Sequence, residues 1–200
     1  MLTRLKERIQ TALTGQAELL HRAGLTPNQV SGLGILLAFL AGCIYWTWQI
    51  NHLFLVIAPV LFLLSGFCDA LDGIIARLHG ETTALGGFLD SLLDRYADTF
   101  ILVALMGSGL CDVFWGSAAL AGSLLVSYAR ARAEAAGIEM ETIGLAERAE
   151  RMVILAAASF AAFVWLEALD WGVRILAVLT NLTVLQRAFC FYRATEQKRG

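Results

Sequence analysis

The sequence predicts an all-α integral membrane protein with six transmembrane helices, a basic amphipathic helix before them, and both termini in the cytoplasm. Two observations carry this prediction. Hydrophobic residues make up 58% of the 200 residues, and the mean hydropathy is +0.67, whereas soluble domains are roughly 45–50% apolar. The apolar residues are also gathered into six stretches separated by short turns and by one longer loop, residues 133–151, and most are long enough for a hydrocarbon core about 30 Å thick.

The first 22 residues predict a helix that lies on the membrane surface. Leucine and isoleucine recur there at helical spacing, and basic residues are interleaved with them: Arg4, Lys6, Arg8 and Arg22. This pattern is typical of an interfacial amphipathic helix and differs from a cleavable signal, which needs an uninterrupted apolar core. We therefore divide the chain into a juxtamembrane helix over residues 1–22 and a single domain over residues 23–200.

Six spans follow in order, with Thr26 and Pro27 typical of the helix start before the first. Pro59 predicts a kink in the second span, and Gly32, Gly34 and Gly42 allow close packing of the first. The predicted spans cover residues 30–48, 53–78, 85–107, 114–132, 152–166 and 172–192. All Lys and Arg residues except Arg95 and Arg174 fall on the side shared by the termini. The positive-inside rule makes this side cytoplasmic, in the cell membrane.

Four aspartates stand inside two of these apolar stretches. Asp69 and Asp72 lie in the second predicted span, and Asp90 and Asp94 lie in the third. A charge within a span costs about 2.5–3.5 kcal/mol on insertion scales, so four together predict a shared role. Because residues 79–84 form a short turn, the two helices should be antiparallel neighbours. Both pairs then reach one depth, roughly 8–14 Å from the turn at about 1.5 Å per residue.

Facing carboxylates at one depth predict a divalent-cation site, since they would repel one another without a cation. All-oxygen ligation favours Mg²⁺, with Mn²⁺ or Ca²⁺ as alternatives. Four carboxylates can hold two ions about 3.5–4 Å apart, an arrangement used in phosphoryl transfer. A cation- or proton-coupled transporter and an inert bundle or lipid-binding scaffold are the alternatives. The transporter would explain the aspartates but not Gly73, Ala76 and Arg77.

The residues around the aspartates complete a known pattern. The stretch from Asp69 to Asp94 reads D-x2-D-G-x2-A-R-x8-G-x3-D-x3-D and resembles the signature of the CDP-alcohol phosphotransferases. All eight positions are filled, by Asp69, Asp72, Gly73, Ala76, Arg77, Gly86, Asp90 and Asp94. The resemblance covers roughly residues 22–190. It implies transfer of a phosphatidyl-type group from a CDP-linked lipid to an alcohol, with release of CMP.

The same resemblance implies a role for individual residues. Asp69 and Asp90 would bind both Mg²⁺ ions, Asp72 one and Asp94 the other. Asp94 would also be the general base that takes the acceptor proton. The CDP-lipid would be bound by Asn28, Ser31, Gly73, Arg77 and Thr83. Thr83 is assigned by spacing alone, and a helix cap is the alternative role for it.

Basic residues gather at the cytoplasmic ends of the last three spans. The segments S-Y-A-R-A-R-A-E from 127 and G-L-A-E-R-A-E-R from 144 resemble the inositol-phosphate branch of the family. That branch comprises phosphatidylinositol-phosphate synthases and their archaeal ether-lipid equivalents. The likeness implies an acceptor-phosphate site at Arg130, Arg148 and Arg187, with Arg151 as a substitute for Arg148. Lipid headgroup binding is the alternative role, and glycerol 3-phosphate, as in phosphatidylglycerophosphate synthase, is the alternative acceptor.

The expected partners are therefore a CDP-linked lipid, a phosphorylated polyol and membrane lipid, with no nucleic acid. Members of the resembled family are homodimers, and the small residues of the first span would permit this here. Arg95 is expected to pair with an acidic neighbour. Four scattered cysteines lack metal-ligand spacing, and we interpret them as packing residues. They are Cys43, Cys68, Cys111 and Cys190.

Overall fold

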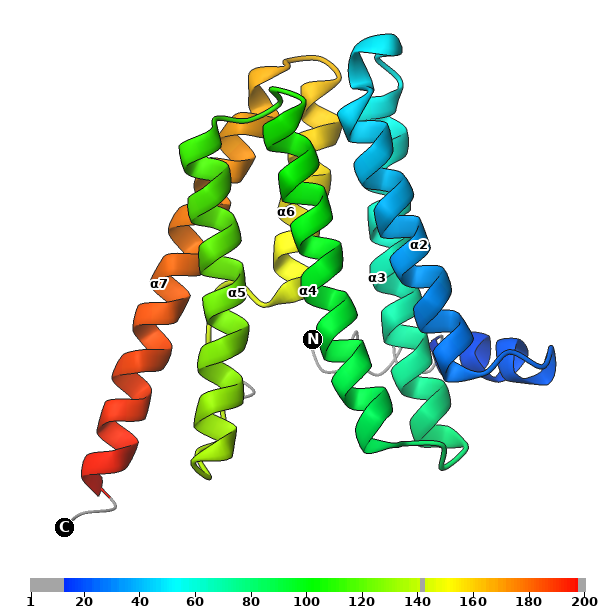
Figure 1. Ribbon diagram of the computed structural model, residues 1–200, viewed down its shortest axis with the longest axis vertical. Coiled ribbons are helices and arrows are strands. Elements are labelled where there is room, and N and C mark those ends of the chain that lie inside the picture. The colour runs from blue at the N-terminus through cyan, green and yellow to red at the C-terminus, as the bar shows by residue number, and fades with distance from the viewer. Residues whose placement is uncertain (1–12, 141–142, 198–200) are drawn as a thin grey trace, which may run out of the picture.

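The computed structural model describes residues 13–140 and 143–197, and every regular element among them is a helix (Figure 1). The elements are α2 (Pro27–Trp46), a 3₁₀ turn η1 (Trp48–Ile50), α3 (Phe54–Leu78), α4 (Ala84–Gly107), α5 (Val113–Ala135), α6 (Arg148–Ala162) and α7 (Glu167–Gln197). Each predicted span corresponds to one helix. The largest differences are at α7, which begins at Glu167 instead of residue 172 and ends at Gln197 instead of residue 192. The α6 helix is displaced as a whole by four residues, since it begins at Arg148 instead of residue 152 and ends at Ala162 instead of residue 166.

Three of these helices are long and apolar enough by themselves to cross a membrane: α2, α3 and α7. The α4 helix carries the aspartates and Arg95, and α6 has only 15 residues, where a span normally needs about 20. The structure therefore establishes an all-helical protein with three candidate spans. That all six helices cross the membrane is a finer statement, to which we return below.

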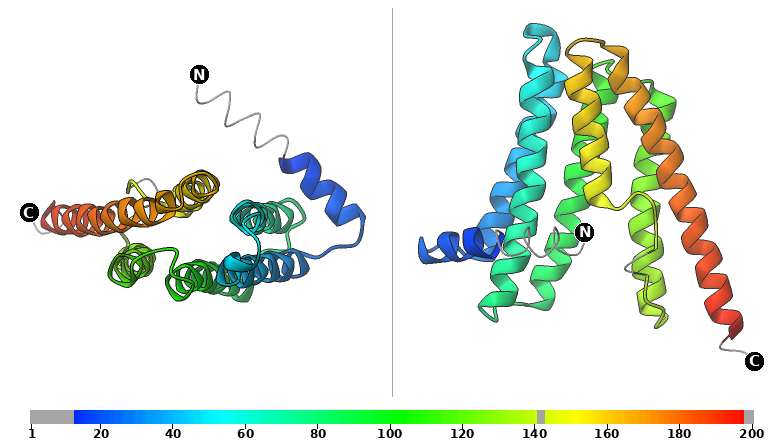
Figure 2. Two further views of the ribbon diagram at one scale, coloured as in Figure 1. Left: turned by 90° about the horizontal axis from the view of Figure 1, so that it is seen from above. Right: turned by 180° about the vertical axis from the view of Figure 1, so that it is seen from behind.

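The helices form two groups that diverge towards the end of the molecule that carries the α3–α4 turn and the C-terminal end of α7 (Figure 1). In one group α2 packs against α3 and α4, and in the other α5 packs against α7. The short α6 joins the groups because it packs against both α3 and α7. It lies in the half of the molecule away from the diverging ends (Figure 2).

The α3 and α4 helices are antiparallel, as predicted, but they do not pack closely along their lengths. Instead α2 bridges them, and glycine lets it approach both. A Cβ added at Gly34 would lie 3.3 Å from Cys68 Cβ on α3, and one added at Gly42 would lie 3.4 Å from the Phe100 carbonyl oxygen on α4. The space between α3 and α4 is consequently left for the aspartate side chains.

Pro59 allows an additional hydrogen bond between α3 and α6. Proline has no N–H, so the carbonyl of Leu55 loses its usual helical donor. The Ser159 hydroxyl of α6 donates to this carbonyl oxygen at 2.8 Å. Both Leu55 and Ser159 are fully buried. The carbonyl that Pro59 leaves without a donor in α3 is thus satisfied by a hydroxyl of α6, and this bond helps to hold α6 against α3.

The described part of the N-terminal segment, residues 13–22, is helical and runs across the ends of α2 and α3 (Figure 2). Its Ala17 is buried in a cluster with Val30, Leu71 and Ile75, and His21 stacks on His79 with ring centroids 3.5 Å apart. The remainder of the predicted surface helix lies outside the described residues. Residues 13–22 therefore pack on the bundle with part of their surface, which the amphipathic pattern alone did not predict.

The four cysteines are all free, as the sequence predicted. Cys68 and Cys111 are buried, Cys190 is partly buried and Cys43 is exposed. Burial, reinforced by the charges of Asp170 and Asp112, raises the pKa of the Cys111 thiol to about 12. A thiol with so high a pKa is unreactive, so packing is the role the structure supports for it.

Replacing Ser159 by alanine should destabilise the protein by about 1–3 kcal/mol, because it leaves the buried Leu55 carbonyl without a donor. Thermal unfolding in detergent would measure this. Ser117→Ala, at an exposed position of α5, is the matched control and should shift stability by no more than about 0.5 kcal/mol. Equal unfolding temperatures for the two variants would contradict the proposed role of the α3–α6 hydrogen bond.

Candidate active site

The four predicted aspartates converge on the space between α3 and α4. One carboxylate oxygen each from Asp69, Asp72 and Asp90 lies within 4.8 Å of the others. All four aspartates line one narrow pocket, which we call the acidic pocket. Asp72 is the most buried of the four, at 5% exposure, and the Ser31 hydroxyl of α2 donates a hydrogen bond to it. The helix that bridges α3 and α4 thus also orients one of their carboxylates.

This donor set fits a hard divalent cation. Oxygen atoms on opposite sides of a Mg²⁺ ion are about 4.2 Å apart, and for Ca²⁺ about 5 Å, since the metal–oxygen distances are about 2.1 and 2.3–2.6 Å. Three oxygens within 4.8 Å of one another therefore need only small side-chain adjustments to share one ion. The charge on the cluster also demands cations, because adjacent carboxylates cannot all stay ionised alone.

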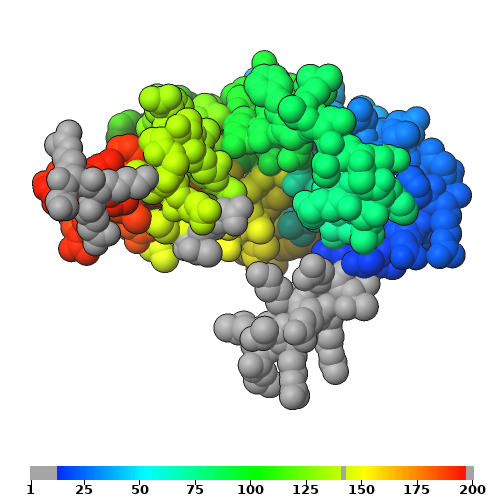
Figure 3. All heavy atoms as spheres, turned by 90° about the horizontal axis from the view of Figure 1, so that it is seen from below, coloured from blue at the N-terminus to red at the C-terminus, as the bar shows by residue number. Residues whose placement is uncertain are grey.

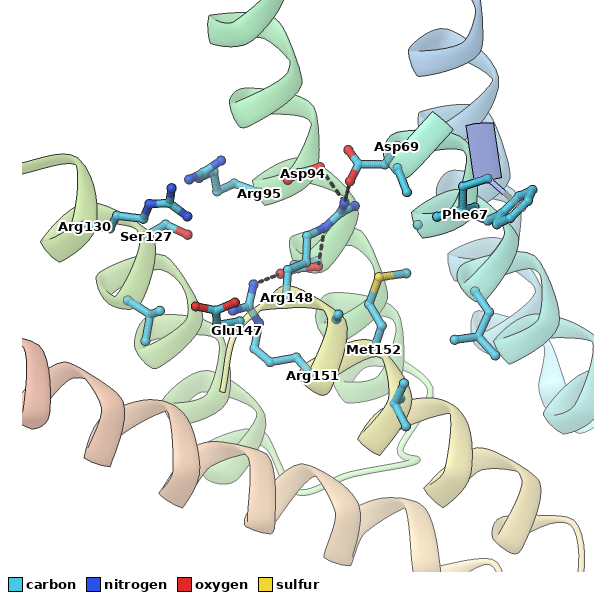
Figure 4. Close-up of a pocket in the computed structure, with 18 of the residues that line it drawn as sticks. Phe67, Asp69, Asp94, Arg95, Ser127, Arg130, Glu147, Arg148, Arg151 and Met152 are labelled. Carbon is cyan, nitrogen blue, oxygen red and sulfur yellow. Dashed lines mark hydrogen bonds and ion pairs between the residues drawn. The ribbon is translucent and has the colours of Figure 1, made fainter. Parts of the chain in front are cut away.

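Arg148, the first residue of α6, reaches into the acidic cluster (Figure 4). Its Nη1 lies 2.6 Å from Asp69 Oδ2 and 2.7 Å from Asp94 Oδ1. One guanidinium nitrogen therefore joins a carboxylate of α3 to a carboxylate of α4. A cationic residue in the first turn of a helix opposes the helix dipole, typically by about 0.3–1 kcal/mol. These two ion pairs offset that cost.

A fifth aspartate, Asp98, belongs to the same network and was not among the predicted site residues. It is 7% exposed, and its Oδ2 accepts a hydrogen bond from Arg151 Nη2 at 2.6 Å. Its Oδ1 lies 3.8 Å from Arg148 Nε. The sequence does contain a signal for it, because Asp90, Asp94 and Asp98 recur at intervals of four on one helix face.

A second pocket, of about 190 Å³, lies on the turn side of the cluster, and we call it the small pocket. All five predicted CDP-lipid residues line it: Asn28, Ser31, Gly73, Arg77 and Thr83. Asp72 and Asp90 line it as well, so the pocket opens onto the carboxylates. A Cβ at Gly73 would come within 3.2 Å of the Arg77 guanidinium. Thr83 also serves as the N-cap of α4, where its hydroxyl accepts from the Gly86 N–H at 2.9 Å.

A larger cavity, of about 800 Å³, lies on the other side of the cluster. Seen from below, α6 forms the recessed base of a hollow between the two helix groups (Figure 3). Asp69 and Asp94 line this cavity, and so do all four arginines predicted to bind the acceptor: Arg130, Arg148, Arg151 and Arg187. The structure thus brings together residues from α3, α4, α5, α6 and α7.

The four arginines differ in how they are held. Arg130 is partly exposed and pairs with Glu134 at 2.7 Å. Arg151 and Arg187 are 6% and 3% exposed and donate to acceptors of the protein itself. Arg151 donates to the Ala146 carbonyl at 3.1 Å as well as to Asp98. Arg187 donates to the Ile143 and Val126 carbonyls at 2.8 and 2.6 Å. Arg130 is therefore the most accessible of the four arginines, whereas Arg148 is paired with Asp69 and Asp94 at the edge of the cavity.

Arg95 also lines the large cavity, opposite Arg148 and near Arg130 (Figure 4). The sequence predicted that it pairs with an acidic neighbour. Among the described residues its guanidinium makes no ion pair and donates instead to the Ser91 carbonyl. Its charge therefore adds to the positive lining of the cavity.

The loop before α6 is shaped by Gly144, which has φ +144°, and a Cβ there would lie 2.6 Å from the Thr183 methyl carbon. The next residue, Leu145, donates its N–H to Thr183 Oγ1 at 3.2 Å. Together with the Arg187–Ile143 bond, this contact holds the loop on α7. The loop in turn places Arg148 at the edge of the acidic cluster.

The geometry and comparison with known proteins agree on the class. The chain belongs to the CDP-alcohol phosphatidyltransferase family, whose model matches residues 24–193. It is a membrane transferase of phospholipid biosynthesis that uses a divalent metal. This assignment decides against the transporter alternative, and it confirms the family resemblance seen in the sequence.

Several of the relatives are named as inositol-phosphate enzymes. The chain is 36% identical over 189 residues to the archaetidylinositol phosphate synthase of Pyrococcus horikoshii, covering 94% of this chain and 95% of that protein. It is 39% identical to the same enzyme of Methanothermobacter thermautotrophicus, with 83% of each chain covered. It is 36% identical to the phosphatidylinositol phosphate synthase of Cutibacterium acnes, covering 90% of this chain and 92% of that protein.

Solved structures show the same fold. The phosphatidylinositol phosphate synthase of Mycobacterium tuberculosis with CDP-DAG bound superposes with a TM-score of 0.77 at 29% identity, covering 90% of this chain and 93% of that chain. A complex of the same enzyme with manganese and citrate superposes with a TM-score of 0.78 at 28% identity, covering 90% of this chain and 88% of that chain.

Asp69→Asn and Asp90→Asn should each weaken divalent-cation binding by at least about tenfold, since even outer-shell partners of metal ligands are worth 10–100-fold. Titration with Mn²⁺, followed by electron paramagnetic resonance, would measure this without turnover. Glu150→Gln removes an exposed negative charge two residues after Arg148 and is the matched control. Unchanged Mn²⁺ affinity in both aspartate variants would rule out the acidic cluster as the metal site.

Proposed function

We propose that the protein transfers a phosphatidyl-type group from a CDP-linked lipid to the hydroxyl of inositol 1-phosphate and releases CMP. The observation that carries this proposal is the placement of the acidic cluster between two differently lined spaces. Asp72 and Asp90 face the small pocket with Asn28, Gly73 and Arg77. Asp69 and Asp94 face the arginine-lined cavity. A pyrophosphate held at the carboxylates would therefore meet an acceptor in the cavity.

In this proposal, the carboxylates would hold two Mg²⁺ ions, with Mn²⁺ as an alternative. Asp69 and Asp90 would serve as ligands to both ions, Asp72 to one and Asp94 to the other. Such ions, when bound, neutralise charge on the pyrophosphate and on the leaving CMP. The protein contributes the arrangement: three oxygens already lie close together, and Ser31 holds Asp72 in place.

Asp94 is proposed as the general base. Because it lines the large cavity, it is on the side from which the acceptor hydroxyl would approach. It takes the hydroxyl proton as the acceptor oxygen bonds to the lipid phosphorus, and the bond from that phosphorus to CMP breaks. CMP leaves on the side of the small pocket, where Asn28, Ser31, Gly73, Arg77 and Thr83 are proposed to bind the nucleotide.

The acceptor phosphate is proposed to bind between Arg130 and Arg148, with Arg151 and Arg187 supplying further positive charge. The first N–H groups of α6 have no carbonyl partner within the helix, and Ala149 in that first turn lines the cavity. A helix N-terminus favours an anion. The names of the relatives support inositol phosphate as the acceptor, and glycerol 3-phosphate is the second candidate.

We also propose that all six helices cross the cell membrane, with both termini and the active site facing the cytoplasm. Polar residues of α4, α5 and α6 line the large cavity. Because they face the cavity, they need not face lipid if these helices cross the membrane. The α3–α4 turn lies at the same end of the molecule as residues 13–22 and the end of α7 (Figure 1), where the basic residues gather. The division into residues 1–22 and 23–200, and a homodimer, belong to the same proposal.

The function is tested by CMP release from purified protein with Mg²⁺ and ester- or ether-linked CDP-lipid. Inositol 1-phosphate, free inositol, glycerol 3-phosphate and serine would be compared as acceptors. Free inositol leaves the cavity's guanidiniums unpaired, so it should be used roughly 10³-fold less efficiently. Equal use of free inositol would overturn the phosphate site, and preference for glycerol 3-phosphate would change the acceptor.

Two variants sharpen the acceptor test. Arg130→Gln should raise the KM for inositol 1-phosphate by at least about tenfold, since a hydrogen bond to a charged group is worth about 1.5–3 kcal/mol. The KM for the CDP-lipid should not change. Arg132→Gln removes an exposed arginine two residues away that does not line the cavity, and it should behave as the unaltered protein.

Asp94→Asn should lose about 10²–10⁴ in kcat, the usual contribution of a positioned general base. Because the CDP-lipid pocket does not include Asp94, lipid affinity should stay within a few-fold. Binding of a non-hydrolysable CDP-lipid analogue would measure that affinity separately. A fall in affinity as large as the fall in kcat would assign Asp94 a mainly structural role.

A further inference from the structure

Arg148 pairs with two of the four carboxylates that are proposed to hold divalent cations, and one of them, Asp69, belongs to the group whose oxygens lie within 4.8 Å of one another. Arg148 Nη1 lies between Asp69 Oδ2 and Asp94 Oδ1, at 2.6 and 2.7 Å (Figure 4). These two oxygens come from facing helices, so a cation that bridges α3 and α4 must take up much of the same space. The guanidinium and such an ion are therefore competitors for one position.

The positive charges of Arg148 and the divalent cations strengthen their competition for the carboxylates. Four carboxylates are fully neutralised by two divalent cations, so the charge of Arg148 would then be in excess. Repulsion between a guanidinium and a nearby ion is strong in a site that is partly shielded from water. The Arg148 side chain is only 17% exposed here, so solvent screens that repulsion weakly. Once ions bind, Arg148 needs another anionic partner.

The structure offers Arg148 a second position. Arg148 lines both the acidic pocket and the large cavity, so its side chain lies at the boundary between them. Its Nε and Asp98 Oδ1 are buried, and neither atom has a hydrogen-bond partner. They lie 3.8 Å apart, too far for a hydrogen bond. A modest turn of the guanidinium away from Asp69 could bring these two atoms together.

We propose that Arg148 is an exchangeable counter-cation that neutralises Asp69 and Asp94, leaves them when divalent cations bind, and then binds the acceptor phosphate in the large cavity. Asp98 is the positioning residue that keeps the guanidinium at the boundary in both states. The identity of the phosphate rests on the proposed function, whereas the exchange with the metal does not. It follows that divalent cations and the acceptor phosphate strengthen each other's binding, because such coupling is reciprocal.

The exchange is tested on metal affinity alone. Arg148→Gln removes the competitor, so Mn²⁺ measured by electron paramagnetic resonance should bind at least about tenfold more tightly than to the unaltered protein. Arg132→Gln removes an exposed arginine outside both pockets and should leave Mn²⁺ affinity unchanged. Equal or weaker Mn²⁺ binding by Arg148→Gln would overturn the proposal, whatever reaction the protein catalyses.

The role of Asp98 is tested by a double-mutant cycle. Without Asp98, Arg148 should pair more tightly with Asp69 and Asp94, so Asp98→Asn should weaken Mn²⁺ binding several-fold. In the Arg148→Gln background the same change should have a clearly smaller effect. Equal effects in both backgrounds would show that Asp98 does not act through Arg148. Thermal unfolding of each variant would verify that it is folded, and the Arg148→Gln measurement stands independently.

The phosphate half of the proposal is tested by calorimetric titration with inositol 1-phosphate and with inorganic phosphate. Both should bind at least about tenfold more tightly in Mn²⁺ than in EDTA, and Arg148→Gln should abolish this difference. A difference that persists in Arg148→Gln would overturn the coupling. If inorganic phosphate alone shows the coupling, the exchange holds and the inositol acceptor of the proposed function fails, so the two ideas are separable.

Discussion

Repulsion among the aspartates of α3 and α4 is the constraint on which the rest of the structure depends. Three carboxylate oxygens within 4.8 Å in a partly dehydrated space cannot remain ionised without positive charge nearby. Arg148 provides that charge from a third helix. The site is therefore built from opposed charges on three helices, and any ion that enters it changes the partners of all of them.

The packing keeps this charged space open. The α3 and α4 helices do not pack closely on each other, and α2 bridges them through Gly34 and Gly42. The short α6 is fixed to α3 by the bond from Ser159 to the carbonyl that Pro59 leaves free. Its N-terminus consequently ends inside the protein, where the large cavity separates the two helix groups. A longer α6 would fill the space in which an acceptor is proposed to bind.

The convergence of the carboxylates could be predicted from spacing because its geometry is local, whereas the residues of the small pocket were named through the family resemblance, since Asn28 and Ser31 come from a different helix. Asp69 to Asp94 lie on two helices joined by a short turn, so helical periodicity places them together. The sequence identified the arginines of the cavity, but it could not show which of them are accessible to a ligand. Arg187 and Arg130 look alike in the sequence, yet Arg187 is bound by two carbonyls and Arg130 is partly exposed. Asp98 was missed because it lies one turn beyond the family signature.

The sequence by itself determined the helices, the family and the four aspartates, because apolar periodicity and a short signature are properties of neighbouring residues. Only the tertiary structure decided that α2 bridges α3 and α4, that residues 13–22 pack on α3, and that Arg148 pairs with Asp69 and Asp94. Each of these depends on contacts between residues far apart in the chain. Such contacts are set by side-chain volume and charge in three dimensions, and spacing along the sequence does not encode them directly.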